Sequence, residues 1–305
     1  MAIAKQQTTP SSLSTLLKKV RKRYSSQAKK SKQAKTQEFK YEIALVSYLD
    51  VLGMKDLLAT AGADANQVAE VLERFRSFTS HDDYQNDLWK THFVNFSDLA
   101  VRILPIMTDA NLKYRLGGFF QEMHDLGLIQ INLIDRGILV RGAVAIGDIC
   151  HENGLIFGRG LATAYLLETK AKYPRIVVST EALRATRDNS VLRAEGNSFA
   201  EEMSYLHGFL RRDSDGVWFL DYLALARTDC DSPEQYAQFL LKHKDLIEKQ
   251  RAEVKAMPRA KRKGRLDKLK WLIALHRNHV AENNPTLFLQ ETGQKLRAFN
   301  VSLWR

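Results

Sequence analysis

From residue 42 onward, apolar segments of two kinds alternate along the chain. Short runs rich in strand-forming residues lie at 42–49, 92–96, 100–104, 139–149, 155–157 and 175–179, and segments with helical spacing lie at 65–78, 110–134 and 160–172. The first run, EIALVSYL, has the continuous apolar character of a buried central strand. A helix over 65–78 would gather its large apolar residues on one face, namely Val68, Val71, Leu72 and Phe75.

The order of these segments predicts an α+β fold. It reads β-α-β-β-α-β-β-α-β, which favours a sandwich of helices packed on a mainly antiparallel sheet, of ferredoxin-like type. Asn153-Gly154, between apolar flanks, predicts a hairpin turn. A further strand over 217–222 is expected at an edge of the sheet. A glycine at position 53 breaks the first strand, and a helical period begins at Met54.

The last third of the chain is predicted to be helical. Ser232-Pro233-Glu234-Gln235 combines a serine cap, proline in the first turn and a glutamine three residues after the cap. A long helix is expected from there to about 254, a basic solvated loop at 258–265, and a second helix over 266–280. We therefore divide the chain into a tail (1–40), a core domain (41–225) and a helical extension (226–305) that packs on the core or on a second subunit.

Charge is concentrated in the tail. The net charge is +11, and residues 1–40 hold eleven Lys or Arg against one acid, which is +10, so the remaining 265 residues sum to about +1. The tail is poor in large apolar residues and is predicted to be disordered and solvated, with binding to polyanions as the alternative. Two cysteines, no run of about 20 apolar residues and no secretory signal predict a cytoplasmic protein without a membrane span.

Two aspartates carry the candidate chemistry. Asp50 follows the first strand in YLDVLG, and Asp98 interrupts the next pair of strands in NFSDL, 48 residues later. Neighbouring antiparallel strands lie about 4.8 Å apart, so these carboxylates can share a cation. Carboxylate oxygens suit Mg²⁺ or Mn²⁺, which also take phosphate ligands. Taken alone the pattern is a weak signal, because aspartates at strand ends are more often turn formers or helix caps.

The surrounding segments resemble a known family. YLDVLGM, NFSDLAV, LVRGAVAIGDI, LIFGRGLATAYLLE and YPRIVVS follow the order and spacing of class III nucleotidyl cyclases over roughly 41–180, and their wording is most similar to the Pycsar pyrimidine cyclases of bacterial anti-phage defence. The resemblance implies conversion of UTP, or alternatively CTP, to the 3′,5′-cyclic nucleotide and pyrophosphate. It further implies two Mn²⁺ or Mg²⁺ ions per site, a homodimer with sites at the interface, and a downstream effector that responds to the cyclic nucleotide.

The resemblance also implies roles for particular residues. Asp50, Asp98 and the Val51 carbonyl would bind the metals, and Tyr48 would face the nucleotide. For the phosphates, the Gly53-Met54 turn would offer backbone N–H groups.

The sequence departs from the family at the positions expected to act in the transition state. An asparagine and an arginine are expected where Ala162 and Leu166 stand, and Val94 and about Leu155 occupy the base-reading positions. These residues disfavour a purine substrate. Other cations would then have to stabilise the transition state. The candidates are Arg159 and Arg141, and Arg141 is also expected to bind substrate.

Other residues receive structural interpretations. His276 and His279 are predicted to lie on a solvated helix face, His92 to be a structural strand residue, and Glu168 and Arg175 to form an ion pair. The leading hypothesis is a uridylate cyclase. The alternatives are a cytidylate cyclase, a degenerate cyclase domain that only senses nucleotide, and a protein that binds nucleic acid through its tail.

Overall fold

The computed structural model describes residues 39–54, 58, 64–79 and 86–283. The chain divides into two units at Lys40, and every element below belongs to the unit that begins at Tyr41. The predicted tail therefore lies almost wholly outside the described residues, as does most of the helix expected after Met54.

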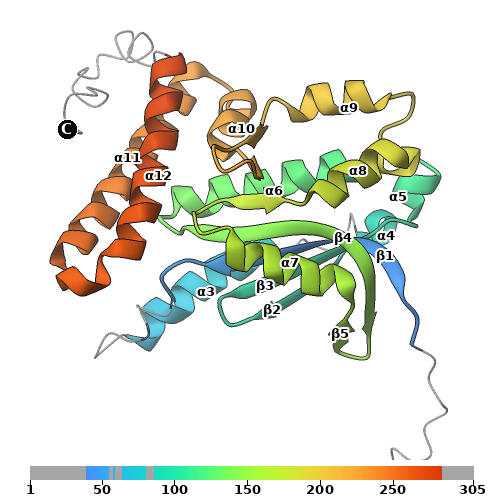
Figure 1. The fold of residues 1–305 in the computed structure, drawn as a ribbon, viewed down its shortest axis with the longest axis horizontal. Coiled ribbons are helices and arrows are strands. Elements are labelled where there is room, and N and C mark those ends of the chain that lie inside the picture. Colours follow the sequence, from blue (N-terminus) through green and yellow to red (C-terminus); the bar gives the residue numbers. More distant parts are fainter. Residues whose placement is uncertain (1–38, 55–57, 59–63, 80–85, 284–305) are drawn as a thin grey trace, which may run out of the picture. The chain divides into compact units, whose positions relative to one another are not determined.

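One mixed sheet forms the centre of the described unit (Figure 1). Its strands follow the order β2-β3-β1-β4-β6-β8-β7, with β5 paired to β4. Only β4 and β6 run parallel among the described pairs. The strands are β1 (Glu42–Val51), β2 (His92–Phe96), β3 (Leu99–Pro105), β4 (Val140–Glu152), β5 (Leu155–Phe157), β6 (Ile176–Val178), β7 (Leu210–Arg212) and β8 (Trp218–Leu220).

Helices cover the sheet and extend beyond it. They are α3 (Ala65–Thr79), α4 (Asn86–Trp89), α5 (Asp109–Leu112), α6 (Gly118–Asp135), α7 (Arg159–Lys170), α8 (Thr180–Asp188), α9 (Phe199–Leu206), α10 (Tyr222–Asp229), α11 (Pro233–Ala256) and α12 (Lys263–Asn283), with short 3₁₀ turns at Ser190–Leu192 and Arg259–Lys261. The predicted α+β sandwich with a mainly antiparallel sheet and C-terminal helices is confirmed. The predicted edge strand is wrong in position, because β8 lies between β6 and the outer strand β7.

β1 is central, and its alternate residues face two different cores. Leu45 and Leu49 belong to the larger apolar cluster, which includes Phe119 of α6. Ala44 and Val46 belong to a smaller cluster that includes Ala164 of α7. Because side chains alternate along a strand, Tyr48 and Asp50 lie on the α7 side. This alternation decides which face of the sheet carries the candidate site.

The helical last third packs on the same unit. The predicted start of α11 is confirmed, since the Ser232 hydroxyl accepts a hydrogen bond from the Gln235 amide at 3.3 Å and Pro233 occupies the first turn. Apolar residues of α11 and α12 share a buried cluster with β6, β8 and α10. The basic segment between the two helices contains a short 3₁₀ turn, and α12 already begins at Lys263.

Two histidines of α12 are buried, which corrects the predicted solvated face. His276 and His279 retain only 3% and 1% of their exposure. His279 Nε2 lies 2.9 Å from both carboxylate oxygens of Asp221, and His276 Nδ1 lies 3.0 Å from His243 Nδ1. The sequence did not reveal this burial, because the spacing of the two histidines along the helix does not show that α11 covers this side of α12.

Candidate active site

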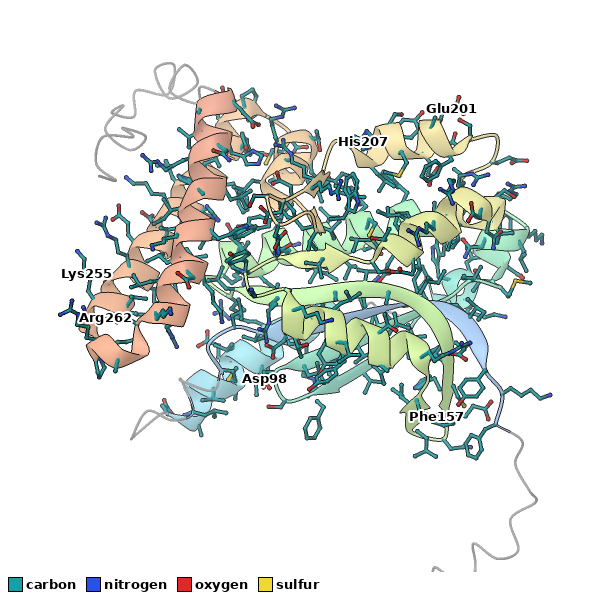
Figure 2. All side chains as sticks on the ribbon, in the orientation of Figure 1. Asp98, Phe157, Glu201, His207, Lys255 and Arg262 are labelled. Carbon is teal, nitrogen blue, oxygen red and sulfur yellow. The ribbon has the colours of Figure 1, made fainter. Side chains whose placement is uncertain are left out.

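The two aspartates lie next to each other at one end of the sheet. β1 and β3 are antiparallel with Asp50 opposite Leu99, so Asp98 is the neighbour of the residue that faces Asp50. The Val51 amide donates a hydrogen bond to the Asp98 carbonyl oxygen at 3.0 Å, which fixes the turn to β1. Ser97 has φ of 56° in the tight β2–β3 turn. Figure 2 shows Asp98 at the opposite end of the sheet from Phe157 of β5.

An arginine on β4 joins Asp50 to a carboxylate of α7. Arg141 is directly opposite Asp50 in the β1–β4 register, and its Nη2 donates to Asp50 Oδ2 at 3.1 Å. The Arg141 Nε also forms an ion pair with Glu168. Burial raises the pKa of the Asp50 carboxyl, Arg141 opposes that rise, and the neighbouring Asp98 carboxylate adds to it. Burial likewise raises the pKa of Glu168, again against Arg141. The electrostatics of this end favour additional positive charge.

A broad apolar groove begins beside the aspartates, on the α7 side of the sheet. It has a volume of about 530 Å³. It is lined by Tyr48, Val94, Leu99 and Val101 from the sheet, and on the side of β5 and α7 by Ile156, Phe157, Gly158, Leu161, Ala162 and Tyr165. The Tyr48 and Tyr165 rings meet edge to face at 5.6 Å. Burial, followed by the nearby Glu168 carboxylate, raises the pKa of Tyr48, so its hydroxyl stays protonated.

The predicted site residues after Asp50 can contribute only through their backbone. Gly53 adopts φ of 94°, a conformation that disfavours any side chain. The Met54 side chain is buried in the large core, so only its backbone is available for a ligand. Val51 is also buried, and its predicted role is likewise a backbone role.

Two other predicted arrangements are corrected. Arg159 pairs with Asp148, and its side chain is 85% exposed. Asp148 is seven residues along β4 from Arg141, or about 23 Å at strand spacing, so Arg159 is remote from the aspartates. The predicted Glu168–Arg175 ion pair does not form, because Glu168 pairs with Arg141, and Arg175 binds Asp213 and Asp215.

The expected base-reading positions contribute only apolar contacts. Val94 lines the groove. Leu155 is half exposed, and its neighbour Ile156 lines the groove instead. Ala162 also lines the groove, and Leu166 is exposed. Among the described lining residues, the side-chain polar groups are the two tyrosine hydroxyls.

Sequence reasoning missed one cation near the aspartates. Lys268 of α12 is among the charges that lower the pKa of both Asp50 and Glu168 against the main effect of burial. It lies 218 residues beyond Asp50 (268 − 50) in a segment without a recognisable motif. Only the packing of α12 against the sheet brings it to this end.

The donor set fits a hard divalent cation that shares its ligands with a substrate. Within the described ranges, no group of three or more His, Cys, Asp and Glu side chains has the geometry of a complete metal cage. Asp50 and Asp98 offer two carboxylates on adjacent strands. Mg²⁺ and Mn²⁺ sites of one or two carboxylates are completed by water and phosphate oxygens. The residues present match that pattern.

Comparison with known proteins does not establish the family. No protein-family model and no curated protein matches the chain. Among solved structures, the guanylyl cyclase domain of the RhoGC fusion protein from the fungus Blastocladiella emersonii is 13% identical with a TM-score of 0.40, covering 61% of this chain and 97% of that one.

Two further solved structures show likenesses of similar strength. A class III adenylyl cyclase-like ATP-binding protein from Pseudomonas aeruginosa is 9% identical, with a TM-score of 0.36 and coverage of 57% and 42%. The catalytic core of a rhodopsin-guanylyl cyclase in complex with ATPalphaS is 11% identical, with a TM-score of 0.35 and coverage of 61% and 99%. These likenesses are too weak to decide family or substrate. Among the described helices, none has the length and apolar character needed to cross a membrane.

Proposed function

We propose that this protein is a metal-dependent nucleotide cyclase that converts a pyrimidine nucleoside triphosphate, with UTP preferred over CTP, to its 3′,5′-cyclic monophosphate. The observation that carries the proposal is the adjacency of Asp50 and Asp98 at one end of a groove of about 530 Å³. That volume falls in the range of small-molecule sites. The cyclic product would act as a second messenger for an effector in anti-phage defence.

The reaction balances with groups that the chain and substrate supply. The 3′-oxygen forms a bond to the α-phosphorus, the bond from that phosphorus to the β-bridging oxygen breaks, and pyrophosphate leaves with the electron pair. The hydroxyl proton passes to water. Two bound Mn²⁺ or Mg²⁺ ions would acidify the hydroxyl and neutralise the phosphate charge.

Within this mechanism, Asp50 and Asp98 hold the ions, with the Val51 carbonyl as a further ligand. Arg141 orients Asp50 through its 3.1 Å hydrogen bond. Its charge is shared with Glu168, so Arg141 serves first as a positioning residue, and its predicted contact with substrate requires that it turn away from one of these carboxylates.

The groove supports a pyrimidine. Its described lining offers apolar surface and the hydroxyls of Tyr48 and Tyr165, and lacks the carboxylate or amide side chains that would pair with a purine edge. A hydrogen-bonding pocket rejects wrong bases strongly, whereas an apolar slot selects mainly by size. We therefore expect purines to be disfavoured because the groove lacks partners for their polar edge, and expect weaker discrimination between UTP and CTP.

A homodimer would complete the site. Large apolar side chains on β2, β5 and α7 remain exposed around the groove, including Phe96, Leu155, Phe157, Tyr165 and Leu166. Contiguous exposed apolar surface of this kind is typical of a protein interface. Analytical ultracentrifugation should show a dimer. Tyr165→Asp should shift the protein toward monomer and reduce turnover, and a monomeric wild-type protein with full activity would contradict this part of the proposal.

The function is tested by incubating the protein with each of the four nucleoside triphosphates and Mn²⁺, with products identified by mass spectrometry. Cyclic UMP is the expected main product. Asp50→Ala and Asp98→Ala should each reduce turnover about 10⁴-fold, because each removes a ligand of ions that stabilise the transition state by several kcal/mol. Both variants should keep the wild-type circular dichroism spectrum. Activity that survives either substitution would sink the proposal.

A second candidate function is nucleotide sensing without turnover. The observation in its favour is that Ala162 and Leu166 of α7 bring no polar group to the site. This candidate predicts that UTP binds with Mn²⁺ in a titration experiment and is recovered unchanged. Formation of cyclic product at any rate that depends on Asp50 rejects it.

A further inference from the structure

The C-terminal helices reach the same end of β1 as the candidate metal ligands. A small cavity lies where the turn after β1 meets them, and it is lined on the sheet side by Leu52, Gly53 and Pro174. From α11 and α12 come the polar residues Gln250, Arg265 and Lys268, and the rest of the lining is aliphatic, namely Leu139, Val254, Leu269 and Leu272. Arg265 and Lys268 are three residues apart, which places their side chains on one face of the helix.

The positions along β1 put this cavity and the apolar groove on two sides of the aspartate. Tyr48 lines the groove, Asp50 follows, and Leu52 and Gly53 line the cavity. At about 3.3 Å per residue, the span from Tyr48 to Leu52 is about 13 Å. An extended ligand that contacts Asp50 in its middle can therefore occupy both spaces.

Size and charge distinguish the two spaces. The cavity holds about 70 Å³ against about 530 Å³ for the groove. The cavity is therefore much the smaller space and suits a compact group better than a base with its sugar. The groove is apolar apart from two tyrosines, whereas the largely aliphatic cavity carries two cations, Lys268 and Arg265, of which Arg265 is also paired with Glu253. A small anionic group fits this combination.

Lys268 of α12 lines the cavity together with Leu52 and Gly53, which directly follow the last residues of β1. Arg265 is held on the other side by Glu253, at 3.9 Å. Figure 2 shows Lys255 and Arg262, which flank the α11–α12 connection, toward the same left-hand end of the view as Asp98. The helical extension thus supplies cations to a site whose carboxylates come from the core.

We propose that the cavity between the β1 turn and α12 binds the terminal phosphates of the nucleotide and the departing pyrophosphate, with Lys268 as the principal ligand and Arg265 as the second. This inference rests on the proposed cyclase function and deepens it, because it gives the helical extension a part in the reaction. Lys268 meets negative charge that grows on pyrophosphate as its bond to the α-phosphorus breaks.

The test uses the full-length protein and inorganic tripolyphosphate as the probe. Isothermal titration at low and fixed ionic strength compares the wild type with Lys268→Gln and Arg265→Gln. The matched control is Lys270→Gln, which removes the same charge from an exposed position on the same helix. Lys268→Gln should weaken tripolyphosphate binding about tenfold, Arg265→Gln about threefold, and Lys270→Gln by less than twofold. Lys268→Arg should restore most of the affinity.

Kinetics provide a second readout that a purely structural role would not change. Lys268→Gln should raise the inhibition constant of pyrophosphate and the KM for UTP, with an unfolding midpoint in urea close to that of Lys270→Gln. If Lys268→Gln and Lys270→Gln bind tripolyphosphate equally, the inference is overturned even when cyclic UMP is made. If Lys268 governs tripolyphosphate binding but none of the four nucleotides is cyclised, the anion site stands and the proposed function fails.

Discussion

Two regions of this protein use the same types of side chain, arginines and carboxylates, for different purposes. At the end of β1, beside Asp98, the carboxylates of Asp50 and Glu168 share Arg141, Lys268 acts on both, and burial raises the pKa of each. Beneath α12, Arg175 is fully buried between Asp213 and Asp215. Several aromatic rings also surround Arg175, namely those of Tyr173, Phe219 and Trp271.

The difference lies in how completely each group is satisfied. The Trp271 Nε1 donates to Asp213 at 2.7 Å, and Arg175 also donates to the Ala171 carbonyl, so the second region closes on itself. The regions differ most at the arginine itself, since Arg141 is 22% exposed and Arg175 is fully buried, although Asp215 beside Arg175 is open to solvent at 42%. A satisfied buried network fixes a structure, whereas carboxylates in excess at the mouth of a groove are suited to bind cations.

The largest expected effect concerns the closed region. Arg175→Ala would leave the carboxylates of Asp213 and Asp215 without their buried cation. Breaking a fully buried pair costs about 3–5 kcal/mol, and we expect the lower end of that range here because Asp215 is 42% exposed and water screens it. Equilibrium unfolding in urea should show this loss of free energy. Arg175→Lys should recover part of it. A change below about 1 kcal/mol would mean that the closed region does not hold α12 to the sheet.

The buried histidines should make stability depend on pH. Burial lowers the pKa of His276 to about 4, from about 6.5 in an unfolded chain, and lowers the pKa of the adjoining His243. His279 and Lys244 also disfavour a charge on His276. The unfolded state therefore binds more protons below about pH 6.5, and folding stability falls as pH decreases toward 4.

The expected size follows from the shift at His276. It amounts to about 2 kcal/mol between pH 7 and pH 5, because each pKa unit corresponds to 1.36 kcal/mol. Urea unfolding at pH 7, 6 and 5 measures it. In His276→Gln, whose overall stability is lower, the slope against pH should be reduced. An unchanged slope in that variant would contradict the assignment.

An arginine from the open region provides the matched contrast to Arg175. Arg141→Gln should lower the free energy of unfolding by less than Arg175→Ala does, since water can reach Asp50 and screen part of the loss, although the buried Glu168 also loses its partner. Turnover should fall about tenfold, because Asp50 loses the hydrogen bond that orients it. Paired measurements of stability and kcat distinguish the two arginines. Equal stability losses for Arg141→Gln and Arg175→Ala would remove the distinction between the regions.

The smallest expected effect concerns the basic tail. Removal of residues 1–40 takes away +10 of the +11 net charge, yet the candidate site lies wholly in the unit that begins at Tyr41. Cyclic nucleotide formation should be unchanged within about twofold. Nucleic-acid binding that disappears with the tail and falls steeply with salt would instead support a polyanion-binding role.

The sequence by itself determined the α+β order of elements and the pairing of Asp50 with Asp98 at one end of the sheet. Apolar runs of period two and segments of period 3.6 are local properties, and a hairpin between residues 92 and 104 necessarily places its turn beside the neighbouring strand. The start of α11 was equally local, because the capping sequence at Ser232 acts within one turn.

Only the tertiary structure decided which charges meet. Arg159 was expected at the site from its motif, yet its partner Asp148 lies about 23 Å along β4 from Arg141, which faces Asp50. Lys268 is distant from Asp50 in the sequence but acts on its pKa. The burial of His276 and the partners of Arg175 depend in the same way on the packing of α11 and α12 against the sheet. Packing between elements far apart in the chain leaves no periodic signal in the sequence. Asp50, Asp98 and Arg141 were therefore predictable, whereas Lys268 and the pairing of Glu168 with Arg141 were not.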